Sequence, residues 1–218
     1  MSLVITALVS RLFNFIIPPT CAGCEAPLRS PVLFCSACAD SVTPLPSASA
    51  HTEQGLRIVS PFAYGGPVAS AIHRLKFSNR PELARTLARP VAERILLMTP
   101  LPDALLVPVP STPARIVERG YNQSALLALA IRRILGIECL PLALTRTHFA
   151  PHQIGADKAQ RAAQVAGAFT ATSQALASAS VILVDDVITT GATSAACASA
   201  IEAMGAKVIA IAAIARVL

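Results

Sequence analysis

The chain has 218 residues, a net charge of +6, 54% hydrophobic residues and only 14% charged residues. Its length suits one α/β domain with a small additional module, and its apolar content excludes an intrinsically disordered protein. The first element is the apolar segment 1–18, which Arg11 interrupts and a Pro-Pro pair ends. This segment predicts a short packed helix, with a membrane-surface element as the alternative, and neither a transmembrane helix nor a secretory signal. We therefore expect a cytoplasmic protein.

Two C-x2-C turns follow, separated by ten residues, and they contain Cys21, Cys24, Cys35 and Cys38. Each turn directs two thiolates at one centre, so the pair predicts a closed tetrahedral S4 site for structural zinc. Disulfides are the first alternative, but the chain shows no export signal. A redox C-x-x-C motif is the second, and it would not need a second copy. Cys139 and Cys197 stand alone and are expected in the core.

Prolines and small polar residues fill the next segment, residues 41–60. This composition is typical of a linker and places a domain boundary near residue 50. We therefore expect two domains. Residues 1–50 would hold the N-terminal helix, the four-cysteine zinc module and the linker, and residues 51–218 would form the main domain.

Strand-like and helix-like segments alternate along the rest of the chain. The predicted strands are 58–64, 104–109, 179–184 and 208–215, and the predicted helices are 67–77, 81–98, 122–135 and 192–204. This alternation predicts an α/β fold with a mostly parallel sheet and helices on both faces.

The positive charge is concentrated in the middle of the chain. Residues 74–161 contain 13 Lys or Arg against 6 Asp or Glu, whereas the remaining residues are nearly balanced. This excess favours anionic ligands such as phosphates or nucleic acid, and a basic surface without a ligand is the alternative.

A predicted buried strand, residues 181–184, ends in two adjacent carboxylates and a loop of small and hydroxylated residues. Ligands of open α/β folds bind beyond the carboxyl ends of such strands. Adjacent carboxylates need hydroxyls or a cation nearby, and the start of the next helix favours a phosphate. The pattern predicts a ribose 5-phosphate site made of Asp185, Asp186, Thr189, Thr190, Gly191, Ala192 and Thr193. A surface turn is the alternative, and it does not explain the loop composition.

This string resembles the signature of type I phosphoribosyltransferases. The resemblance implies a phosphoribosyltransferase-like fold that binds phosphoribosyl diphosphate together with Mg²⁺. The two aspartates would hold the ribose hydroxyls, and the threonine-rich loop would hold the 5-phosphate. No catalytic residue is assigned.

A second block narrows the resemblance. The segment 107–110 is followed by two arginines and an Asn-Gln pair, and Leu-Lys-Phe occurs at 75–77. Together with the cysteine pattern, this resembles the ComF family, which is associated with DNA uptake in natural competence, from about Pro18 to Arg216. One position departs from the family pattern, because Gln164 stands where Asn is expected.

Several central residues are candidates for contact with diphosphate or with a nucleic-acid backbone: Lys76, Ser111, Arg115, Arg119, Asn122, Gln123, Arg146 and Arg161. Asn122 could instead cap the following helix. Tyr121 could stack on a base or be half-buried. Residues 146–163 resemble the mobile lid of the family.

Two functions follow from these features. The first is a ComF-like protein that binds phosphoribosyl diphosphate and acts in DNA uptake by handling single-stranded DNA, with proteins of the uptake machinery as possible partners. The alternative is an active phosphoribosyltransferase that transfers ribose 5-phosphate to an unidentified base and releases diphosphate. The scarcity of aromatic residues speaks against base stacking, and the absence of a recognisable hood for the base speaks against transfer.

Overall fold

The structure is a computed structural model that describes residues 19–46, 50–98, 103–146 and 167–218. Its main sheet has the order β1-β2-β8-β7-β4, and short β3 also pairs with β8. All pairings except β1 with β2 are parallel, as the sequence predicts. The strands are β1 (Ala50–His51), β2 (Arg57–Val59), β3 (Phe62–Ala63), β4 (Ala104–Pro108), β7 (Ser180–Ile188) and β8 (Lys207–Arg216).

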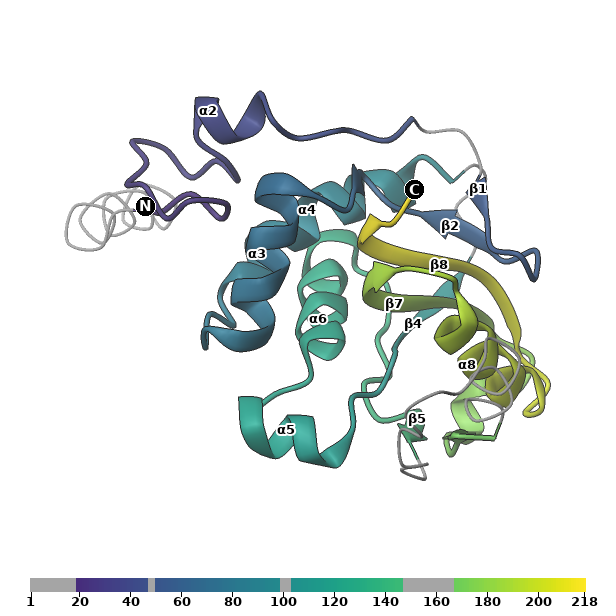
Figure 1. The fold of residues 1–218 in the computed structure, drawn as a ribbon. Helices are drawn as coiled ribbons and strands as arrows, with labels where there is room; N and C mark the ends of the chain where they lie inside the picture. The colour runs from purple at the N-terminus through teal and green to yellow at the C-terminus, as the bar shows by residue number, and fades with distance from the viewer. Residues whose placement is uncertain (1–18, 47–49, 99–102, 147–166) are drawn as a thin grey trace, which may run out of the picture.

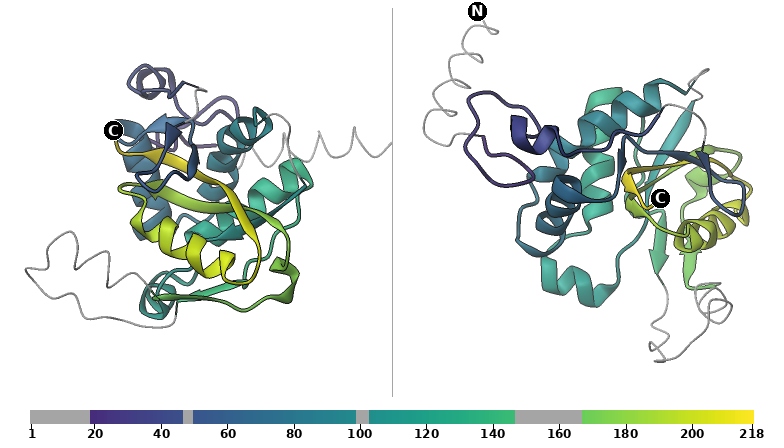
Figure 2. Two further views of the ribbon diagram at one scale, coloured as in Figure 1. Left: turned by 90° about the vertical axis from the view of Figure 1, so that its right-hand side faces the viewer. Right: turned by 45° about the horizontal axis from the view of Figure 1, so that its top comes forward.

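Helices cover both faces of this sheet (Figure 1), which confirms the predicted fold class. The helices α3 (Gly66–Phe77), α4 (Leu83–Leu96) and α6 (Gln123–Leu135) lie on one side, and α8 (Ala192–Glu202) lies on the other (Figure 2). Because side chains of a strand alternate between faces, β7 contributes to two cores. Ile182 and Val184 pack with α4 and α6, whereas Val181 and Leu183 pack with α8.

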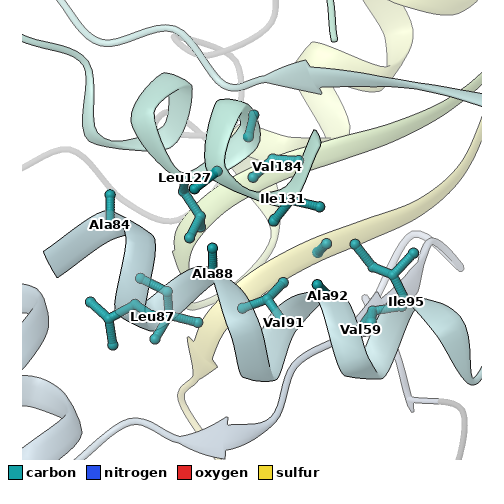
Figure 3. Packing of buried hydrophobic residues seen from close by; sticks show 14 of the residues in the cluster. Val59, Ala84, Leu87, Ala88, Val91, Ala92, Ile95, Leu127, Ile131 and Val184 are labelled. Carbon is teal, nitrogen blue, oxygen red and sulfur yellow. The ribbon is translucent and has the colours of Figure 1, made fainter. Parts of the chain in front are cut away.

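The helix α4 shows why its segment folds as it does. Its apolar residues recur at helical spacing and form one buried face. Ala88 points toward Leu127 of α6, and Ile131 of α6 and Val184 of β7 lie on the same side of α4 (Figure 3). Truncating a buried leucine such as Leu87 to alanine would cost about 2–5 kcal/mol.

Two strands differ from the sequence prediction. The strand β7 continues past the two aspartates to Ile188, because β8 extends alongside it as far as Arg216 and completes the hydrogen-bond ladder. The segment predicted as one strand over 58–64 is split into β2 and β3 around Pro61, which has no N–H to donate.

The remaining elements are short. An unpredicted helix, α5 (Pro113–Arg119), starts where the Thr112 hydroxyl accepts from the Arg115 amide and ends at Gly120, which has φ +81°. The others are α2 (Ser36–Ala39), β5 (Leu144–Arg146), β6 (Phe169–Ala171) and the 3-10 turn η1 (Gln174–Leu176).

Some predictions fall on residues that the structure does not describe: the helix within 1–18, Arg161, Gln164 and almost all of segment 146–163. Among the helices it does describe, none combines the length and apolar character needed to cross a membrane.

Candidate functional site

The four cysteines of the two C-x2-C turns form one cluster. Their Sγ atoms all lie within 4.8 Å of one another, and Cys24 Sγ is 3.7 Å from Cys35 Sγ. A tetrahedral S4 site with Zn–S bonds of about 2.3 Å has S–S edges of about 3.8 Å. The cluster can therefore bind a structural metal such as zinc.

The backbone supports a thiolate at Cys21. Burial raises the pKa of this thiol, but hydrogen bonds from backbone amides, led by the Cys35 amide at 3.3 Å, outweigh burial and lower it to about 6. Burial and hydrogen bonds with the other three cysteines raise the pKa of Cys38 to about 12. Metal ligation requires thiolates, so Cys21 is ready to bind, whereas a metal would have to displace the proton of Cys38.

The four-cysteine module, residues 19–41, packs on α3. A Cβ added at Gly23 would lie 2.7 Å from the Cβ of Pro67, and Ala22 is part of the main core. The Arg74 side chain donates to the Ala22 carbonyl over 3.0 Å and pairs with Glu25 over 3.3 Å. The module is thus attached to the helix whose last turn carries Lys76.

The paired aspartates lie near the end of β7 and face α3 and α6. Lys76 Nζ of α3 is 2.8 Å from Asp186 Oδ1, and the Ser124 hydroxyl of α6 donates to Asp185 Oδ1 over 3.0 Å. Asp186 is 4% exposed, and within the described part of the chain its Oδ2 atom has no hydrogen-bond partner. Buried oxygens are normally paired, so this atom is an open acceptor for a ligand hydroxyl or a metal-bound water.

The Asp185 carboxyl group holds its proton more tightly than a free carboxyl group does. Burial raises the pKa of Asp185 to about 7, and the negative charge of Asp186 raises it as well. Hydrogen bonds from the Asp186 amide and from Ser124, and the charge of Lys76, oppose this rise. Near neutral pH the pair therefore carries less than two negative charges, which reduces the repulsion between them.

The threonine loop leads directly into α8, with Gly191 as the N-cap at φ +79°. Thr189 and Thr190 are exposed, and the Thr190 hydroxyl accepts from the Ala192 amide over 3.4 Å. Exposed hydroxyls beside the amides of a helix N-terminus suit a phosphate. The half-exposed Ala192 and Thr193 form the first turn of this helix.

A turn that the sequence analysis did not connect with this loop lies against it. A Cβ at Gly191 would lie 2.8 Å from Thr52 Cγ2 and 3.7 Å from Gln54 Oε1, in the turn between β1 and β2. Ser124 was missed as well. No local pattern marks it, since its partner Asp185 is 61 positions away.

The central polar residues divide into two groups. Asn122 caps α6, accepting from the Ser124 amide and donating to the Val109 carbonyl, and Gln123 accepts from Arg119 over 3.0 Å. Tyr121 is half-buried and donates to the Leu75 carbonyl over 2.7 Å. These contacts confirm the cap at Asn122 and the half-buried alternative for Tyr121.

The second group lies beyond β4. Arg115 is exposed on α5, and the Ser111 Oγ atom is buried without a partner among the described residues. Burial lowers the pKa of Arg146, and the charge of Arg115 lowers it further, so the structure brings these two arginines near each other. Arg146 also stacks on Phe169, with its guanidinium carbon 5.4 Å from the ring centroid.

No family model matches this sequence. It is 31% identical over 196 residues to DNA utilization protein YhgH of Salmonella typhi, covering 87% of this chain and 80% of the relative. It is 30% identical over 203 residues to DNA utilization protein YhgH of Escherichia coli K12, and the match covers 87% of this chain and 86% of the relative. It is also 31% identical over 188 residues to Competence protein F of Haemophilus influenzae, and the match covers 79% of this chain and 80% of the relative.

Proposed function

Because the chain belongs to the ComF family of DNA utilization protein YhgH and Competence protein F, we propose that it acts in DNA uptake. In this role it would bind phosphoribosyl diphosphate and handle single-stranded DNA. The names of the relatives support the role in uptake. The main support for phosphoribosyl diphosphate as the ligand is the Asp186 Oδ2 atom, which is buried near the start of the threonine loop and has no hydrogen-bond partner among the described residues.

Each part of the ligand has a chemically matching group. The ribose hydroxyls would donate to Asp185 and Asp186, and the 5-phosphate would accept from the loop 189–193 and the amides at the start of α8. The diphosphate would lie at the segment 110–112 after β4, where Ser111 Oγ is buried and unpartnered among the described residues. Mg²⁺ bound with the ligand would neutralise the diphosphate charge. Zinc is the metal we propose for the cysteine cluster.

Calorimetry with phosphoribosyl diphosphate and Mg²⁺ tests this site. Asp186→Asn removes one charged acceptor, and we expect an affinity about 10- to 100-fold lower, because hydrogen bonds to charged groups contribute about 1.5–3 kcal/mol. The matched control is Asp103→Asn, since Asp103 is exposed and lies just before the start of β4, at the edge of the sheet opposite to the site. Equal affinity of both variants and the wild type would refute the proposed site.

The loop needs a different probe. A bulky residue at Gly191 would be expected to block the ligand, but it would also meet Thr52 and take up a left-handed backbone. Thr190→Val is a more specific test of the loop, because it removes one hydroxyl and keeps the shape of the side chain. We expect a several-fold loss of affinity for phosphoribosyl diphosphate.

Single-stranded DNA binding should depend steeply on salt if the arginines contact the backbone. Replacing Arg115 and Arg119 together should flatten the slope of log affinity against log salt. Arg115→Gln alone is the sharper variant, because Arg115 is exposed whereas Arg119 is hydrogen-bonded to Gln123. We expect a slope smaller by about 0.7. Arg133→Gln, in the last turn of α6, is the control.

One observation favours the alternative of an active transferase. The turn with Thr52 and Gln54 lies over Gly191 and gives the loop a small cover, which a transferase could use to enclose a base. Release of diphosphate in the presence of candidate bases tests this alternative. An unchanged salt slope in Arg115→Gln would also favour it.

A further inference from the structure

A hollow of about 390 Å³ shares Lys76 with the acidic pair. It lies between the C-terminal end of α3 and the turn from α5 to α6, and its lining includes Lys76, Phe77 and Arg119. Lys76 connects it to the proposed ribose site, because its Nζ atom is 2.8 Å from Asp186 Oδ1. A group bound in the hollow would therefore be close to a sugar held by the aspartates.

Phe77 is an unusual residue for the rim of a polar hollow. It ends α3, the residue is 56% exposed, and it belongs to neither hydrophobic core. The Arg119 guanidinium carbon lies 4.6 Å from its ring centroid, and the ring of His73 lies 4.8 Å away. The guanidinium of Arg119 thus lies over the Phe77 ring, and this stacked pair is here called the Phe77–Arg119 platform.

The platform is held in place by its surroundings. Arg119 Nη1 donates to Gln123 Oε1, and Gln123 is only 8% exposed. Arg119 Nε is buried, and in the part of the chain that the structure describes it has no hydrogen-bond partner. This guanidinium is held by one hydrogen bond and has an N–H group without an acceptor. It therefore suits a flat ligand that has a hydrogen-bond acceptor at its edge.

We propose that the hollow is a nucleobase site in which the base stacks on the Phe77–Arg119 platform. Aromatic rings and guanidinium planes both stack bases, and neither requires a particular base. The exposed Asn79 offers an amide to the base edge. Glu118 also lines the hollow and offsets Arg119, and Lys76 is already paired with Asp186, so the lining carries little free positive charge for a phosphate and favours an uncharged base. The site rests on the proposed function, since the sugar-phosphate would lie at the neighbouring acidic pair and loop.

Phe77→Leu tests the platform, because it keeps an apolar side chain at the end of α3 and removes the aromatic face. Base stacking on one aromatic ring corresponds to roughly 5- to 100-fold in affinity. We expect such a loss for an unstructured single-stranded oligonucleotide, measured by fluorescence anisotropy, with an unchanged salt slope because no charge is removed. Phe77→Trp should restore binding.

Two further ligands identify what is bound. An abasic strand of the same length should bind the wild type and Phe77→Leu equally, since it has no base to stack. Free nucleosides distinguish a base within a strand from a free base. If they bind the wild type and lose affinity in Phe77→Leu, the site accepts a base without a strand.

Tyr64→Leu is the matched control, because Tyr64 is a similarly exposed aromatic, 45% exposed, outside the hollow. Wild-type affinity of Phe77→Leu for both oligonucleotide and nucleosides would overturn the nucleobase site, and so would an equal loss on the abasic strand. Phosphoribosyl diphosphate has no base, so its affinity should not change in Phe77→Leu. Failure of that ligand to bind the wild type would instead refute the proposed function.

Discussion

The four-cysteine module and the proposed phosphoribosyl site are built in opposite ways. All four thiols of the module come from residues 21–38. The phosphoribosyl site joins β7 to Lys76 of α3 and Ser124 of α6, which are far apart in the sequence. The first site depends on two short turns that bring four thiols together, and the second depends on the packing of helices onto the sheet.

This difference determines how each site should fail. Loss of one cysteine from the module would remove the proposed metal, whose binding supplies much of the folding free energy of such small modules. Loss of one group from the phosphoribosyl site leaves the packed core intact but leaves a charge unpaired. The following variants separate these behaviours.

The largest effect, a loss of bound zinc and of local folding in the four-cysteine module, is expected for Cys35→Ser. Elemental analysis should find about one equivalent of zinc in the wild type and close to none in the variant, because a structural site needs all four ligands. Amide exchange should accelerate in the four-cysteine module while the main domain keeps its protection, as the predicted boundary near residue 50 requires.

Cys139→Ala is the control, since Cys139 lies in the core outside the cluster. A wild type that folds its N-terminal module without metal would contradict the zinc prediction. Loss of protection across the main domain would contradict the predicted boundary.

A smaller effect is expected for Lys76→Met. It leaves Asp186, 4% exposed, without its ion-pair partner, and we expect the free energy of unfolding to fall by about 2 kcal/mol. Arg89→Met breaks the exposed pair with Glu93 and should change this free energy by less than about 0.5 kcal/mol. Both are measured by urea denaturation. If Lys76→Met were as mild as Arg89→Met, the acidic pair would not depend on the cation from α3.

The smallest effect is expected for Asp185→Asn and appears as a pH dependence. The raised pKa means that folded Asp185 keeps a proton that the unfolded chain releases between about pH 4 and 7. Stability from this group therefore falls as pH rises through that window. Asn removes the titration and can still accept from Ser124, so we expect the variant to gain about 1 kcal/mol per pH unit relative to the wild type between pH 5 and 7.

Urea denaturation at several pH values checks this expectation. Asp103→Asn should leave the pH profile unchanged, because Asp103 is exposed. A difference between Asp185→Asn and the wild type that does not vary with pH would mean that Asp185 is already ionised at low pH.

Several features could be predicted from the sequence because their cause is local. The C-x2-C spacing brings thiols together through two short turns. The period of apolar residues indicates α4 and α6, and the apolar run before Asp185 indicates a buried parallel strand. Asn122 could be predicted as a cap, although diphosphate contact remained an alternative, because its immediate position before a helical pattern defines the cap.

The tertiary structure alone decided which distant groups meet. The continuation of β7 past Asp186 depends on the length of β8 beside it, which periodicity in β7 does not contain. The pairing of Lys76 with Asp186 and the placement of Thr52 over Gly191 depend on how α3 and the β1–β2 turn dock on the sheet. The exposure of Phe77 and its contact with Arg119 have the same origin, since the burial of a residue on α3 depends on which elements pack against this helix. Local sequence determines the elements of this protein and its four-cysteine cluster, whereas long-range packing determines the composition of the proposed ligand site.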